Sequence, residues 1–259
     1  MRDWKAHLDL EHPCWAGYRV MVGRLDGKAF PDPAALTRLL PPGTVTASGK
    51  PLRFRPASEI PGVDYEWHIH ETGEVSTRND NWHDLFNAFA WCRFPRLKAA
   101  MNALHYRQLD QARDGRRGRQ RDALTLLDES GVIVTSPDAA LLDALARRDW
   151  PDAFVTHRGA WAQSGVMVCG HAILEKFLKP YKALTAHALH VHLDGGMCAA
   201  DLDGELARGL LEGGRLETTQ DLSPLPLMGI PGWWTPGAQD AAFYADRDVF
   251  RPPQIRPGN

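Results

Sequence analysis

Residues 65–105 read YEWHIHETGEVSTRNDNWHDLFNAFAWCRFPRLKAAMNALH and gather most of the residue types that could perform chemistry in this chain. Apolar and polar residues alternate over positions 65–70, which is the period of a half-buried strand. Gly73 suits a turn, and residues 75–78 would form the return strand. The stretch therefore predicts a β-hairpin that leads into helices.

Three favourable N-cap residues at 79–81 predict that a helix begins near Trp82. Apolar residues recur along it at helical spacing, and the opposite side carries no lysine or glutamate. That side carries Asp84 and Asn87, with His83 at its edge. Unpaired buried polar groups cost about 1–3 kcal/mol each, so we expect these three side chains to be hydrogen-bonded, metal-bound or catalytic.

A second helix is predicted after Phe94, because Pro95 is favourable in the first turn of a helix. Lys98, Asn102 and His105 form a polar line along it, at spacings of four and three residues. Each of the two helices thus carries an Asn and a His on one side. We expect the two polar lines to face one another, or to face two later carboxylates, across a single site.

Several motifs in this chain are similar to those of one known family. They are TRNDNWHDLFNA at 77–88, RDALTLLDESG at 121–131, GHAILE at 170–175 and GIPGWW at 229–234. Together they resemble the DUF3025 family of bacterial proteins. That family is one of unknown function, so the resemblance implies a single bacterial domain family over most of the chain and no catalytic assignment.

The composition is that of an ordinary soluble globular protein, with 259 residues, 44% hydrophobic, 24% charged and a formal net charge of −2. No run approaches the roughly 20 apolar residues that span a bilayer, so we expect no membrane and a cytoplasmic protein. Cys14, Cys92, Cys169 and Cys198 stand far apart, which argues against a zinc ribbon and against a disulfide scaffold.

The expected fold is α+β, with the central helices packed against short antiparallel strands. We expect one domain over 1–259, comprising an N-terminal layer at 1–64, a core at 65–221 and an irregular C-terminal strap at 222–259. The strap is rich in proline, glycine and aromatic residues, which excludes long regular elements but favours ordered packing. Further helices are expected over 138–148 and 199–211.

Residues 106–121 are the strongly basic stretch, with six arginines around two glycines. Arg116, Arg117 and Arg121 could hold phosphate, because the guanidinium fork matches phosphate oxygens. Arg78 is a further candidate. The alternative is a solvated loop whose arginines pair with nearby acids.

A strand at 123–127 and its partner at 131–135 are expected to flank a turn that carries Asp128 and Glu129. Carboxylates at a strand end suit a divalent cation, although they are also common in any turn. His171 and Glu175 are four residues apart on a predicted helix and could ligate one metal. The alternative is an ordinary polar pair on a surface helix.

Two functions remain open on these residues. The first is a metal-assisted hydrolase of a phosphate-containing substrate, with nucleic acid as one candidate. Its catalytic residues would be His83, Asp84, Asn87, Asn102 and His105, its substrate-binding residues Arg78, Arg116, Arg117 and Arg121, and its metal ligands Asp128, Glu129, His171 and Glu175. The second is a non-catalytic module that binds a nucleotide, RNA or protein, with the Asn and His residues as a structural hydrogen-bond network.

Overall fold

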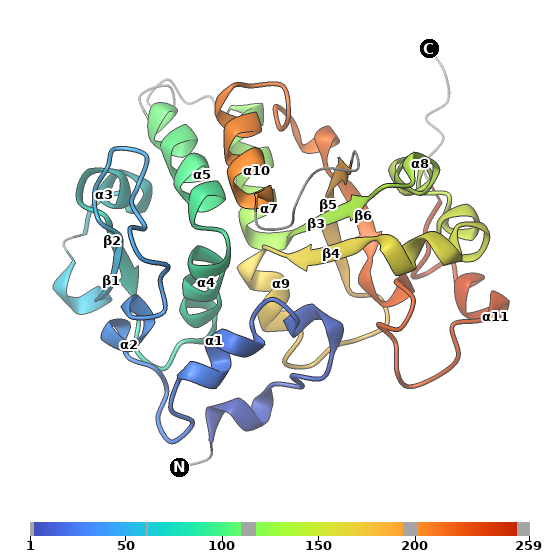
Figure 1. Cartoon of the computed structure of the whole chain (residues 1–259), viewed down its shortest axis with the longest axis horizontal. Coiled ribbons are helices and arrows are strands. Elements are labelled where there is room, and N and C mark those ends of the chain that lie inside the picture. Colours follow the sequence, from blue (N-terminus) through green and yellow to red (C-terminus); the bar gives the residue numbers. More distant parts are fainter. Residues whose placement is uncertain (1–2, 61, 110–117, 194–200, 253–259) are drawn as a thin grey trace.

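The computed structural model describes residues 3–60, 62–109, 118–193 and 201–252. A mixed sheet in the order β4-β3-β5-β6 lies at its centre (Figure 1). β3 pairs in parallel with β5, while the outer pairings with β4 and β6 are antiparallel. The strands are β3 (Gly131–Ser136), β4 (Gly165–Val168), β5 (Thr185–His192) and β6 (Ser223–Pro226).

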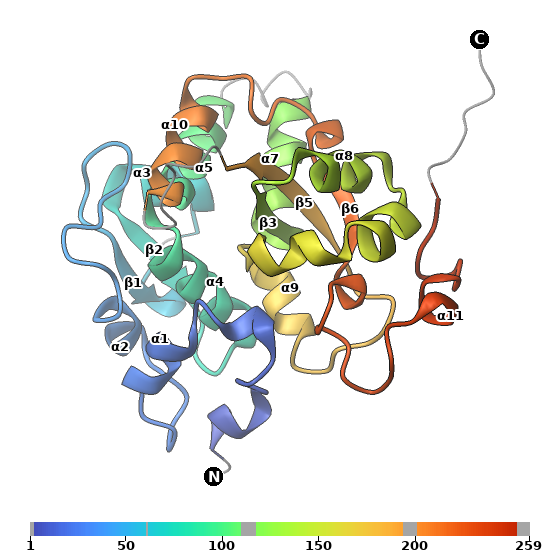
Figure 2. The same ribbon diagram turned by 45° about the vertical axis from the view of Figure 1, so that its right-hand side comes forward.

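Five helices gather beside one end of this sheet (Figure 2). They are α4 (Trp82–Arg93), α5 (Pro95–Arg107), α7 (Arg119–Ser130), α9 (His171–Lys176) and α10 (Leu202–Leu211). α4 packs on α9, α7 packs on both α9 and α5, and α10 packs along α5. α4 and α9 are far apart in sequence, so this packing unites distant segments. At the opposite end lie α8 (Ala139–Arg147) and α11 (Ala241–Tyr244).

A smaller unit covers the other side of α4 and α5 (Figure 1). Its two strands, β1 (Arg53–Pro56) and β2 (Glu74–Thr77), pair in parallel. α3 (Tyr65–Thr72) forms the crossover between them and packs against α5, while α2 (Pro33–Thr37) lies on β1. The N-terminal segment, with α1 (Arg19–Arg24), adds Trp15 and Tyr18 to an aromatic core with Phe86 and Phe89 of α4.

The α+β class is confirmed, but the expectation of antiparallel strands is wrong for two pairings. β1 runs parallel to β2, and β3 runs parallel to β5. Parallel neighbours require a crossover connection, which α3 and α8 help to supply. The strap region contributes β6 to the edge of the central sheet, so part of it is regular structure.

The predicted hairpin strand at 65–70 is wrong, because these residues form α3. Asp64 caps the helix by accepting a hydrogen bond from the Trp67 backbone N–H. Gly73 ends it with a left-handed φ of +75°. These two caps satisfy the ends of an eight-residue helix whose buried residues are His68 and Ile69. Apolar alternation over so few residues does not exclude a helix.

The predicted strand at 123–127 is also wrong, because it lies inside α7. The buried residues Ala123, Leu124 and Leu127 recur at helical spacing. Asp128 and Glu129 therefore lie in the last turn of a helix and not in a hairpin turn. The helices expected near 82, 95, 138 and 171 are confirmed, as is the strand at 131–135.

Among the described residues, no helix is long and apolar enough to cross a membrane. Most of the arginine-rich stretch, including Arg116 and Arg117, lies outside those residues. The phosphate-binding role predicted for these two arginines therefore stays a prediction.

Candidate functional site

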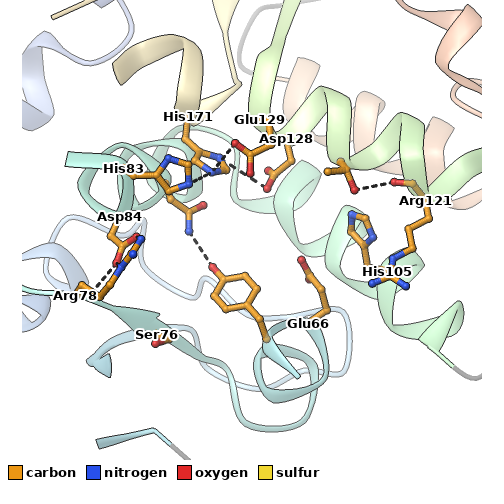
Figure 3. Close-up of a pocket in the computed structure, with 13 residues that line it drawn as sticks. Glu66, Ser76, Arg78, His83, Asp84, His105, Arg121, Asp128, Glu129 and His171 are labelled. Carbon is orange, nitrogen blue, oxygen red and sulfur yellow. Dashed lines mark hydrogen bonds and ion pairs between the residues drawn. The ribbon is translucent and has the colours of Figure 1, made fainter. Parts of the chain in front are cut away.

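The polar residues of the central helices surround a cavity of about 310 Å³ (Figure 3). Its walls come from α3, β2, α4, α5, α7 and α9, which are brought together from positions 65 to 171 of the chain. The lining residues are Tyr65, Glu66, Ser76, Arg78, His83, Asp84, Asn87, His105, Arg121, Thr125, Asp128, Glu129 and His171.

Two imidazoles and one carboxylate converge on one side of this cavity. The Nε2 atoms of His83 and His171 lie 3.0 Å apart, and Glu129 Oε2 lies 3.5 Å from His171 Nε2. One ligand atom from each of the three residues falls within 4.8 Å of the other two. Nitrogen and oxygen atoms this close together are a donor set for a metal ion such as zinc.

Each of the two histidines has a carboxylate near its remaining ring nitrogen. His83 Nδ1 lies 3.2 Å from Glu175 Oε2, and His171 Nδ1 lies 3.8 Å from Asp128 Oδ2. The contact at His83 is a hydrogen bond, and a carboxylate so placed orients the ring and keeps the proton on Nδ1. The 3.8 Å contact at His171 is longer than a hydrogen bond. With its proton on Nδ1, His83 has an Nε2 lone pair free on the side that faces His171.

The chain places His171 beside Glu129 through a close approach of two glycines. At the end of β4, the Gly170 backbone N–H donates to the Gly131 carbonyl at 2.8 Å. A Cβ on Gly170 would lie 2.3 Å from Gly131 N and 2.7 Å from the Glu129 carbonyl oxygen. Only a glycine allows this crossing without a shift of the backbone. The start of α9 is thereby held against the end of α7.

His83 reaches the same place because of the cap on α4. The Asn81 side chain accepts a hydrogen bond from the Asp84 backbone N–H at 3.0 Å, which fixes the first turn of the helix. α4 packs against α9, with Leu85, Phe86 and Phe89 buried. The half-buried His83 therefore faces α9, while its Nδ1 remains near Glu175.

A chain of hydrogen bonds runs behind the cluster of His83, His171 and Glu129. The Lys98 ammonium is buried and bonds to the carboxylate of Asp128 and, at 2.9 Å, to Asn87 Oδ1. The Asn87 amide donates in turn to the Tyr65 hydroxyl at 2.8 Å. Burial works to raise the pKa of Asp128, but Lys98 and His171 outweigh it and hold that pKa below its usual value. Asp128 is thus an ionised partner of Lys98.

Burial shifts several other pocket groups toward their neutral forms. It lowers the pKa of His171 and of His105 to about 4, so both imidazoles are neutral at pH 7. It raises the pKa of Glu129, and it raises that of Glu66 to about 7. A neutral imidazole is the form that binds a metal.

Asp84 is engaged by Arg78 in three hydrogen bonds. Its Oδ2 accepts from the Arg78 backbone N–H at 2.7 Å and from Nε at 2.9 Å, and its Oδ1 accepts from Nη2 at 2.8 Å. Burial acts to raise the pKa of Asp84, but the bonds to Arg78 and its positive charge outweigh burial and hold that pKa below its usual value. This geometry links β2 to the first turn of α4.

The predicted site residues fall into three groups, one of which, Arg116 and Arg117, lies outside the described residues. The structure brings nine of them to the wall of one cavity: Arg78, His83, Asp84, Asn87, His105, Arg121, Asp128, Glu129 and His171. Asn102 and Glu175 lie directly behind that wall, bonded to Glu66 and paired with His83 respectively. Their individual chemical roles stay predictions.

Sequence reasoning missed Tyr65, Glu66, Ser76 and Thr125 as lining residues, and Lys98 as the partner of Asp128. Glu66 was assigned to a strand, where its direction could not be inferred. The signal for Lys98 was available, because it stands on the same helix side as Asn102 and His105. A lysine on that side needs an acidic partner when the helix is buried.

The DUF3025 family model, described as a protein of unknown function, matches residues 52–254. The chain belongs to the DUF3025 family. The matched range contains every residue that lines the cavity. No curated protein and no solved structure matches the chain.

Proposed function

We propose that this DUF3025 protein is a hydrolase that holds a divalent metal ion on His83, His171 and Glu129 and acts on a phosphate-containing substrate. The observation that carries the proposal is the meeting of two Nε2 atoms and one carboxylate at the cavity wall. Three protein ligands that leave one coordination position toward a cavity are typical of catalytic metal sites.

The donor set fits a metal ion of the zinc type. Two imidazole nitrogens bound at about 2.0–2.1 Å in tetrahedral geometry lie about 3.3 Å apart. The 3.0 Å between the two Nε2 atoms is close to that separation. Two nitrogen ligands and one oxygen ligand favour a transition metal over magnesium or calcium, which take oxygen ligands. A bound ion would supply a Lewis acid to the substrate.

The remaining residues of the cavity suit an anionic substrate. Arg121 lines the cavity, forms no ion pair with any described residue, and stands beside the neutral His105 (Figure 3). Its guanidinium is therefore available to phosphate oxygens. Arg78 adds positive charge at the rim while Asp84 orients it. Nucleic acid and smaller phosphate esters share this chemistry, and both remain within the proposal.

A non-catalytic binding module is the second candidate. It is favoured by the Lys98–Asp128, Lys98–Asn87 and Asn87–Tyr65 bonds, since a fully connected buried network is also a common structural device. A module of this kind would bind a nucleotide, RNA or protein and would not need the ligand cluster to hold an ion.

Metal binding separates the two candidates. We expect gently purified protein to contain about one equivalent of zinc or another transition metal by elemental analysis. We also expect titration calorimetry on the metal-free protein to return one tight site. His83→Ala and His171→Ala should abolish that site, while His192→Ala should leave it unchanged, because His192 lies on β5 and does not line the cavity. Metal-free protein that binds no ion at this site would contradict the proposal.

A further inference from the structure

Four carboxylates line the cavity, and three of them have a cation or an imidazole as partner. Asp84 has Arg78, Asp128 has Lys98, and Glu129 faces His171. Glu66 differs, because it forms no ion pair with any described residue. Its side chain instead accepts a hydrogen bond from Asn102 Nδ2, at 2.7 Å. A carboxylate without a charged partner can change its protonation state at low cost.

Glu66 enters the cavity from α3, on the side away from the three proposed ligands (Figure 3). Asn102 anchors it twice, because its Nδ2 also donates to the Glu66 backbone carbonyl at 2.9 Å. Asn102 itself is buried on α5, so the position of the Glu66 carboxylate is determined by the packing of α3 on α5. A substrate held in the cavity would lie between Glu66 and the ligand cluster.

We propose that Glu66 is the proton-transfer residue of this cavity and that Asn102 is its positioning residue. The inference rests on the proposed function and adds to it the group that moves the proton. During hydrolysis of a phosphate ester, a bond forms between a water oxygen and phosphorus, and the bond from phosphorus to the leaving oxygen breaks. Glu66 takes the proton released by the water and returns a proton to the leaving oxygen.

The surroundings of Glu66 support this exchange near neutral pH. Burial raises its pKa to about 7, and the Asn102 bond, which favours the ionised form, offsets part of that rise. Asp64 on the same turn and Asp128 on α7 raise the pKa further, while Lys98 on α5 lowers it. His105 on α5 is neutral, and Arg121 on α7 lines the same cavity. A general acid and base works best with a pKa near the working pH.

The same two hydrogen bonds could also serve only to fasten α3 to α5, so the test must separate chemistry from packing. Glu66→Gln keeps the size of the side chain and an oxygen that can accept the Asn102 bond. Glu71→Gln is the matched control, because Glu71 lies on the same helix and does not line the cavity. Both variants are loaded with zinc and checked for metal affinity and thermal stability.

Two readouts are measured, with bis(p-nitrophenyl) phosphate and inorganic phosphate as probes. We expect Glu66→Gln to lose about 10²-fold or more in kcat with an unchanged metal Kd, and Glu71→Gln to match the wild type. We expect phosphate binding to the zinc-loaded wild type to be linked to proton uptake near pH 7, as shown by calorimetry in buffers of different ionisation enthalpy. That linkage should disappear in Glu66→Gln, and in Asn102→Ala it should move to another pH.

The outcomes distinguish this inference from the function on which it rests. Metal binding with full activity and unchanged proton linkage in Glu66→Gln would overturn the inference alone. Equal loss of stability in Glu66→Gln and Asn102→Ala, with no change in proton linkage, would assign the pair to packing and also overturn it. A wild-type protein that binds no metal, or that neither binds phosphate nor hydrolyses the diester, would overturn the proposed function and the inference together.

Discussion

His83 and His171 face one another through their Nε2 atoms at 3.0 Å, although they are 88 positions apart in the sequence. Their rings meet edge to face, with an interplanar angle of 76°. If neither nitrogen carried a proton, the two lone pairs would repel one another, and a shared cation would remove that repulsion. The position and protonation of the two rings therefore depend on the charged and polar side chains around them.

Glu175→Gln is expected to weaken metal binding by about 10- to 100-fold without abolishing it. Glu175 is not among the three proposed ligands, but its Oε2 accepts a hydrogen bond from His83 Nδ1–H and so orients that ring. Calorimetric titration of the metal-free variant measures the effect. Glu205→Gln on α10, outside the lining of the cavity, serves as the control and should bind as the wild type does. Complete loss of binding in Glu175→Gln would instead make Glu175 a ligand, as the sequence first suggested.

Lys98→Met is expected to lower the free energy of unfolding by about 3 kcal/mol, because it leaves the Asp128 carboxylate buried without its partner. Adding Asp128→Asn should restore much of that loss. Urea denaturation at neutral pH measures both. The control is Lys182→Met, since Lys182 and Asp246 form a pair that is about one third exposed, and its loss should cost less than about 1 kcal/mol. If Lys98→Met and the double variant Lys98→Met with Asp128→Asn were equally stable, the charges of Lys98 and Asp128 would not be coupled.

Asp84→Asn is expected to lower stability by about 1–2 kcal/mol while leaving the metal affinity unchanged. The reason is the loss of charge in the three bonds to Arg78. Since the folded-state pKa of Asp84 is lowered, its stabilising effect is present above the unfolded pKa and is lost as the pH falls through the folded value. The difference from the wild type should therefore be largest at neutral pH and shrink in acid.

His83→Gln should show the opposite pattern, with metal binding lost and stability nearly unchanged.

His105→Gln is expected to make the protein less sensitive to acid. In the folded wild type, burial lowers the pKa of His105 to about 4. Between that pH and about 6.5, the unfolded chain binds a proton at this residue and the folded chain does not, so the wild type loses stability as the pH falls. Between pH 7 and pH 4, the free energy of unfolding should fall by up to about 3 kcal/mol less in the variant than in the wild type. Urea denaturation at several pH values measures this difference. His7→Gln at an exposed position should keep the wild-type slope.

Local signals were sufficient for α4 and α5. Asn81 supplies a side-chain cap before an apolar helical stripe, and Pro95 cannot continue α4 but is favourable in the first turn of α5. Both boundaries follow from backbone hydrogen bonds within a few residues. The same holds for α8, where Asp138 accepts from the Leu141 backbone N–H as a cap should.

Local signals were not sufficient for α3 and α7. In α3, only His68 and Ile69 are buried, so the apolar pattern of residues 65–70 does not identify the buried face. In α7, the run 123–127 is so short that its apolar residues fit the period of a strand as well as that of a helix. Packing of α3 and α7 on α5 decided both, because burial of a helical face outweighs weak local preferences.

The sequence by itself predicted which residues to examine: His83 and Asn87 on a helix side without lysine or glutamate, and Asp128, Glu129 and His171 as candidate metal ligands. Only the tertiary structure decided their partners. The crossing of Gly170 over Gly131 sets His171 against Glu129, and the packing of α4 on α9 brings His83 to the same point. Side chains on separate elements have no sequence spacing that relates them, so their pairing depends on how those elements pack.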